Sequence, residues 1–191
     1  MTEAIHRVQG RASGDATDRA LIARWMAGDQ RAATQLVDRH AQALARFVAS
    51  LGWGERDEVD EIVQDTFVRA FSSLHHFRGD SSLRTWLLSI ARNLFRDRLR
   101  SAKAQRRMVA IEEDHAVTEH DALDGALADE TEARMLAAVD RLTPTQREVF
   151  TLRVGEGLSY KEIAGVVGST EGAARVHYHN AMRSIKELLN E

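Results

Sequence analysis

The sequence predicts an all-α protein with two small helical domains, joined by a flexible acidic linker, the C-terminal domain being a helix-turn-helix. Three observations support this. Proline occurs once in 191 residues, at Pro144, and aromatic residues make up only 6%, which disfavours β-rich folds. Apolar residues make up 43% and recur at helical spacing. Residues 112–132 break that spacing and hold nine acidic residues without Lys or Arg.

Composition divides the chain into four parts. Residues 1–16 are small and polar without a period, which predicts a disordered tail. Residues 17–100 form the first domain, 101–132 the linker and 133–191 the second domain. The chain has no cysteine, which excludes disulfides, thiolate metal sites and a cysteine nucleophile. No apolar run reaches membrane-spanning length and no signal peptide is visible, so we expect a cytoplasmic protein without membrane insertion.

Two helices open the first domain. The first starts near Thr17 or Asp18 and stops at Gly28, and Asp29 then caps a longer helix. His40 lies on the apolar stripe of that second helix. A lone histidine there is expected to be a hydrogen-bonded core residue rather than a ligand.

A third helix, around residues 57–70, has two unlike faces. Its apolar face consists of Val59, Ile62, Val63, Thr66, Phe67 and Ala70. Its acidic face consists of Asp57, Glu61, Gln64 and Asp65, with Val68 among them. Spacing alone leaves two interpretations open, a solvated exterior or a docking surface for a basic partner.

A fourth helix follows, with Ser81 or Ser82 as its N-cap. Its polar stripe consists of Ser89, Arg92, Asn93, Arg96 and Arg100. Between residues 84 and 107 there are eight Lys or Arg and one acid, Asp97. Since only Asp97 could pair locally, a phosphate ligand is favoured over a salt-bridged exterior.

The loop before this helix consists of Phe77, Arg78, Gly79, Asp80, Ser81 and Ser82. An aromatic ring, an arginine, a flexible glycine and short hydroxyls can hold an unstacked base. An ordinary interhelical turn fits equally well.

The acidic linker is also open to two interpretations, and an extended spacer is favoured over a mimic of nucleic acid. His115 and His120 lack a compact ligand spacing, so no metal or cofactor is expected.

The second domain contains two capping boxes. Thr143-Pro144-Thr145-Gln146 opens one helix, and Ser159-Tyr160-Lys161-Glu162 opens a short helix that ends at Gly168. Thr170 then caps the final helix. Two helices joined by about three residues, with small Ala164 at their crossing, form a helix-turn-helix pattern.

The final helix is expected to enter the major groove of DNA. Its candidate DNA-binding residues are Thr170, Glu171, Arg175, Val176, His179, Asn180 and Arg183. Arg175 fits a guanine edge, Glu171 a cytosine amino group and Asn180 an adenine edge. The sequence shows no converging acid, base and nucleophile and no glycine-rich phosphate loop, so we assign no catalytic residue and expect no enzyme.

Four stretches resemble, in order and spacing, the two-domain extracytoplasmic-function (ECF) sigma factors of bacterial RNA polymerase. They are LVDRH, DEIVQDTFVRAF, FRGDSSLRTWLLSIARNLFRDRLR and LTPTQREVFTLRVGEGLSYKEIAGVVGSTEGAARVHYHNAMRSIKELL. The resemblance covers residues 18–100 and 133–189. It implies that the protein directs promoter-specific transcription initiation.

The resemblance also implies a role for each surface. The acidic face would dock on the β′ clamp helices of core polymerase, with the β subunit as a further contact. The loop 77–82, with Arg92, Asn93, Arg96 and Arg100, would capture and melt the −10 promoter element, holding a flipped base near Asn93. The final helix would read the −35 element as duplex. The linker would thread the polymerase channel as a nucleic-acid mimic, and an anti-sigma factor is a further expected partner.

Some positions depart from the family pattern. Ser169 replaces an isoleucine, Ala173-Ala174 replaces Thr-Val, and His177 and Asn180 stand where arginine is common. The final helix is therefore less basic, which leaves its base contacts open. The alternative function is a stand-alone helix-turn-helix regulator whose first domain senses a ligand or dimerises, and a helical adaptor that binds only proteins is a third.

Overall fold

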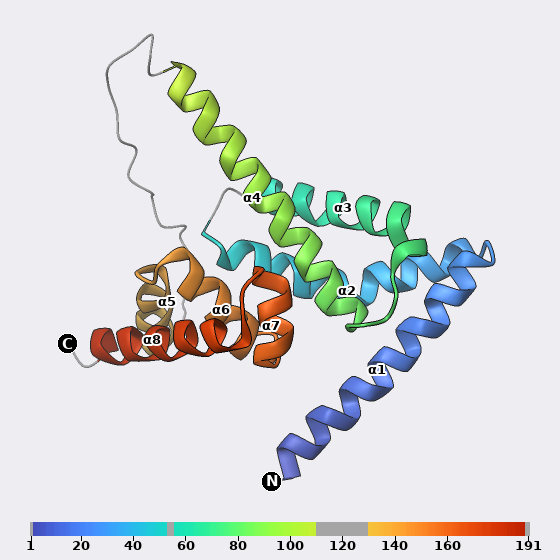
Figure 1. Cartoon of the computed structure of the whole chain (residues 1–191), viewed down its shortest axis with the longest axis horizontal. Coiled ribbons are helices and arrows are strands. Elements are labelled where there is room, and N and C mark those ends of the chain that lie inside the picture. The colour runs from blue at the N-terminus through green and yellow to red at the C-terminus, as the bar shows by residue number, and fades with distance from the viewer. Residues whose placement is uncertain (1, 53–55, 110–129, 190–191) are drawn as a thin grey trace.

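The computed structural model describes residues 2–52, 56–109 and 130–189, and these are helical without a strand, as predicted (Figure 1). The first domain contains α1 (Thr2–Met26), α2 (Gln30–Ser50), α3 (Arg56–Ser73), the 3-10 helix η1 (Leu74–His76) and α4 (Leu83–Val109). The second contains α5 (Glu130–Asp140), α6 (Pro144–Val154), α7 (Tyr160–Val167) and α8 (Glu171–Leu189). None of the helices in these ranges has the length and hydropathy needed to span a membrane.

Two helices extend beyond the predicted boundaries. Helix α1 begins at Thr2, inside the segment 1–16 that was predicted to be a disordered tail. Its second half is anchored on α2, and an anchored helix extends at little cost because nucleation has already occurred. Helix α4 runs to Val109 through the start of the predicted linker, where strong helix formers such as Ala102 and Lys103 continue it. The rest of the predicted linker, 110–129, lies outside the described residues.

The predicted caps are confirmed. Both capping boxes form, at Thr143 with Gln146 and at Ser159 with Glu162. Three side-chain oxygens accept a backbone N–H at the start of a helix: Asp29 from Arg31, Ser82 from Thr85 and Thr170 from Ala173. Gly168 ends α7 with φ 66°, a left-handed conformation that glycine adopts without strain.

The apolar core is continuous between the two domains. The predicted stripes of the first domain bury Phe47, Ile62 and Leu87, and these belong to the same cluster as Leu152 and Ile163 of the second domain. Helix α7 packs on α4, and α6 packs on α2. Figure 1 shows α5 to α8 gathered as one group beside α2 and α4. The two domains therefore share a contact surface as well as a linker.

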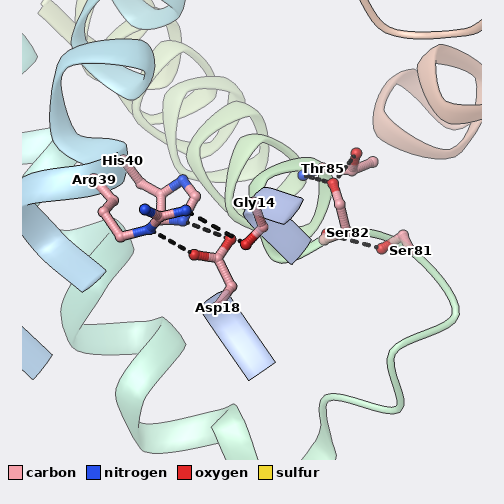
Figure 2. Close-up of polar contacts among 7 residues, drawn as sticks. All are labelled: Gly14, Asp18, Arg39, His40, Ser81, Ser82 and Thr85. Carbon is pink, nitrogen blue, oxygen red and sulfur yellow. Dashed lines mark hydrogen bonds and ion pairs between the residues drawn. The ribbon is translucent and has the colours of Figure 1, made fainter. Parts of the chain in front are cut away.

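His40 lies in a buried hydrogen-bond network between α1 and α2 (Figure 2). Its Nε2 is 3.0 Å from Asp18 Oδ2, and Arg39 Nε donates to Asp18 Oδ1 at 2.9 Å. Arg39 also donates to the carbonyl of Gly14. The prediction of a hydrogen-bonded core histidine is confirmed, and the network explains why α1 is held on α2.

This network makes stability depend on pH. Burial alone raises the pKa of Asp18, but the hydrogen bonds and charges of His40 and Arg39 outweigh it, so its pKa lies below the ordinary value of 3.8. Ionised Asp18 therefore stabilises the fold above that value, and this contribution is lost as the pH falls through the lower, folded-state pKa.

We expect Asp18→Asn to lower the free energy of unfolding at pH 7 by about 1–3 kcal/mol, because His40 and Arg39 lose a charged partner. The difference from wild type should shrink below a pH of about 4, where Asp18 begins to be protonated in the unfolded chain. Urea unfolding at several pH values measures it, with Asp38→Asn, an exposed carboxylate on α2, as control. A difference that does not change with pH would contradict the explanation.

Candidate polymerase and nucleic-acid interface

The polar stripe of α4 is only partly exposed. Asn93, Arg96 and Arg100 face solvent, whereas Arg92 is 6% exposed. Arg92 Nε donates to Glu148 Oε2 of α6 at 2.8 Å, and both side chains are buried. Arg92 is therefore paired with an acid of another helix, which the prediction of Asp97 as the one local partner did not consider. Asp97 does pair with Arg100, at 2.5 Å on the surface.

The second domain is the reason for this burial. Arg84 pairs with Glu156, and Thr85 Oγ1 donates to Glu162 Oε1 at 3.4 Å. Glu156 lies in the loop after α6 and Glu162 lies in α7, which packs on α4, so this part of the second domain covers the first turns of α4. The periodicity of α4 alone contains no information about this contact.

The loop 77–82 borders a cavity of about 570 Å³. Phe77 packs on Trp86 with ring centroids 5.1 Å apart, and Gly79 turns the chain with φ 76°. The other lining residues include loop residues Asp80 to Ser82, α4 residues Thr85 and Ser89, and α7 residues Lys161 and Glu162. Asn93 is not among the lining residues. Ser89, one helical turn before Asn93, does line the cavity, so a base held near both the loop and Asn93 stays a prediction.

The acidic face of α3 is exposed and is bridged by an arginine. Asp57, Glu61 and Gln64 face solvent and Asp65 is half-buried. Arg98 of α4 donates to Glu61 Oε2 at 2.9 Å and to Asp65 Oδ2 at 2.8 Å. Burial lowers the pKa of Arg98, but the hydrogen bonds and charges of these carboxylates outweigh it and raise that pKa above its ordinary value. Sequence reasoning missed Arg98 because its partners lie on another helix.

Most candidate DNA-binding residues of α8 are exposed, and Asn180 is half-buried. Several already contact one another. Arg175 pairs with Glu171 at 2.8 Å and its guanidinium lies 4.9 Å from the ring centroid of Tyr160, while Arg183 donates to Asn180 Oδ1 at 3.4 Å. Exposed pairs of this kind contribute little stability, so they can be exchanged for contacts with a ligand. Tyr160, at the start of α7, was not singled out from the sequence.

Both domains match known families. Sigma-70 region 2 matches residues 36–105, and Sigma-70, region 4 matches residues 132–185. The chain is also 31% identical over 186 residues to the ECF RNA polymerase sigma factor BldN of Streptomyces coelicolor, which covers 96% of this chain and 70% of BldN. The chain belongs to the ECF sigma factors of the sigma-70 family.

Solved structures of sigma factors are similar to this one. CnrH, in complex with the cytosolic domain of CnrY, superposes with a TM-score of 0.66 and 34% identity, over 91% of this chain and 97% of that chain. The sigma factor RpoE, in complex with the anti-sigma factor NepR from Bartonella quintana, has a TM-score of 0.66 and 27% identity, over 82% and 96%.

As an ECF sigma factor, the protein acts in transcription initiation and binds DNA through the helix-turn-helix of region 4. The stand-alone regulator is not favoured, because the first domain matches sigma region 2.

Proposed function

We propose that this sigma factor docks on core RNA polymerase through the acidic face of α3 and reads promoters with its two domains. Helix α8 reads the −35 element as duplex, while the loop 77–82 and the stripe of α4 capture and melt the −10 element. The main support is that the first domain exposes two surfaces of opposite charge, the carboxylates of α3 and the basic end of α4 with Arg96 and Arg100. The acidic surface suits a basic protein partner and the basic one suits phosphates.

The cavity beside the loop supports base capture. Its volume of about 570 Å³ falls in the range of small-molecule sites, and Phe77, Trp86 and the serine hydroxyls offer stacking and hydrogen bonds. Unstacking a base costs a few kcal/mol, and stacking on aromatic side chains returns about 1–3 kcal/mol. Once polymerase holds both domains on one promoter, binding of the second domain to DNA becomes an intramolecular step. Promoter melting therefore needs no ATP.

Further partners follow from the same proposal. The β′ clamp helices are the docking site for the acidic face, the β subunit is a further contact, and the acidic linker threads the polymerase channel. An anti-sigma factor is also proposed, since the similar RpoE was solved in complex with the anti-sigma factor NepR.

In vitro transcription with core polymerase and a randomised promoter library tests the function. We expect transcripts from promoters that share two motifs at a fixed spacing. Asn93→Ala, on the exposed part of α4, should flatten the −10 preference by about 1–3 kcal/mol for each base edge that Asn93 recognises, and should leave the −35 preference unchanged. Ser101→Ala, exposed on the same helix, is the control. Tight binding to a palindromic site without polymerase, and no promoter-dependent transcription, would overturn the proposal.

A further inference from the structure

The ring of Tyr160, at the start of α7, is held from several sides. Ser159 caps α7 and its hydroxyl accepts from the backbone N–H of Glu162, which fixes the backbone next to Tyr160. Arg153 of α6 lies over the ring, with its guanidinium carbon 4.7 Å from the ring centroid. Tyr178 of α8 meets the ring in an edge-to-face arrangement, with the centroids 5.9 Å apart. The Tyr160 ring is therefore a fixed platform that α6, α7 and α8 share.

The ring of Tyr160 makes these contacts without help from its hydroxyl. Arg153 is anchored separately, because its Nη1 donates to the carbonyl of Leu158 at 2.7 Å in the turn before α7. The Tyr160 hydroxyl has no hydrogen-bond partner in the part of the chain that the structure describes. Removing the hydroxyl should therefore leave the ring where it is.

Arg175 of α8 is the second cation over this ring. Its guanidinium carbon lies 4.9 Å from the Tyr160 centroid, and its Nη2 donates to Glu171 Oε1 at 2.8 Å. The Arg175 side chain is still 63% exposed, so it is ordered without being buried. The face of an aromatic ring attracts a guanidinium group and matches its flat shape. An arginine that is already held gives up less rotamer freedom when it binds a ligand, which strengthens binding.

We propose that Tyr160 is a positioning residue, which holds Arg175 ready to read a guanine of the −35 element. The inference rests on the proposed reading of that element by α8. Arg175 suits a guanine because a guanidinium group can donate two hydrogen bonds to the base, at O6 and N7. Tyr160 itself contacts no base. The first helix of the helix-turn-helix therefore contributes to base selectivity through an arginine of the second helix.

Two substitutions at Tyr160 separate the ring from its hydroxyl. Tyr160→Phe keeps the ring and removes the hydroxyl, whereas Tyr160→Leu removes the ring and keeps an apolar side chain. We would assemble each full-length variant with core polymerase and measure transcription from a promoter library that is randomised in the −35 element. Arg175→Ala identifies the position that Arg175 reads, since the preference for guanine there should fall by about fivefold to a hundredfold.

Tyr160→Leu should lower the preference for guanine at that position by about twofold to fivefold and leave the other −35 positions unchanged, because only Arg175 loses its platform. Tyr160→Phe should keep the wild-type preference, since the ring attracts the guanidinium group without the hydroxyl. The preference is a ratio between promoters for one protein, so a smaller amount of folded protein does not change it. Adding Tyr160→Leu to Arg175→Ala should alter no preference further, because Tyr160 acts through Arg175.

The outcomes separate the positioning role from the proposed function. An equal loss in Tyr160→Phe and Tyr160→Leu would assign the effect to the hydroxyl, as in a contact with a DNA phosphate, and would overturn the positioning role alone. The same holds if Tyr160→Leu changes no preference or changes every −35 position alike, or if Arg175→Ala changes no single position. Absence of any −35 preference in the wild-type holoenzyme would overturn the proposed reading by α8, and with it the positioning role.

Discussion

Replacing Glu61 and Asp65 together by lysine should abolish binding to core polymerase and leave the fold intact. The side chains are 64% and 50% exposed, so the fold does not depend on burying them. Like charges brought together at an interface cost several kcal/mol, and two reversals on one face should weaken binding at least about a hundredfold. Co-purification with core enzyme and far-UV circular dichroism measure the two effects.

Two controls identify the cause. Asp38→Lys with Glu187→Lys makes the same charge change at exposed positions on α2 and α8, and should bind polymerase as wild type does. Arg98→Gln removes only the bridge to Glu61 and Asp65 and should keep most of the binding, since both carboxylates remain. If the double lysine variant still co-purifies with polymerase, the acidic face is not the docking surface.

The acidic face was predictable because it is a property of one helix. Asp57, Glu61, Gln64 and Asp65 are placed together by helical periodicity, whatever packs elsewhere. The same holds for the capping boxes and for the helix-turn-helix, since caps act over three or four residues. Arg98 lay beyond this reasoning, because the contact between α3 and α4 decides which carboxylates it meets.

The inter-domain contact had one weak signal in the sequence. Glu148 lies four residues before buried Leu152 and next to buried Val149, so it is a charged residue on an apolar face. Such a residue needs a partner from elsewhere in the fold, but the sequence does not identify Arg92 as that partner.

Arg92→Ala is the second substitution for which we expect a large effect. In the free protein its effect on stability should differ from that of Arg96→Ala. Both changes remove a proposed phosphate contact, so each should weaken open-complex formation and reduce the salt dependence of binding by roughly one counterion. Arg92→Ala also leaves Glu148 buried without its partner, which costs about 3–5 kcal/mol unless the domains part. Arg96 is exposed, and no acidic side chain in the described ranges pairs with it.

The free Arg92→Ala protein should therefore unfold at a lower temperature, whereas Arg96→Ala should keep the wild-type melting temperature. Calorimetry of the free proteins reports the change in melting temperature, and promoter melting at several salt concentrations reports the effect that the two variants share. The double variant Arg92→Ala with Glu148→Ala should recover much of the stability that Arg92→Ala loses, because no unpaired charge is then buried. It should not recover promoter melting. Normal promoter melting by both single variants would show that the α4 stripe does not take part in DNA recognition. A normal melting temperature of free Arg92→Ala would show instead that Glu148 does not depend on Arg92 in the free protein.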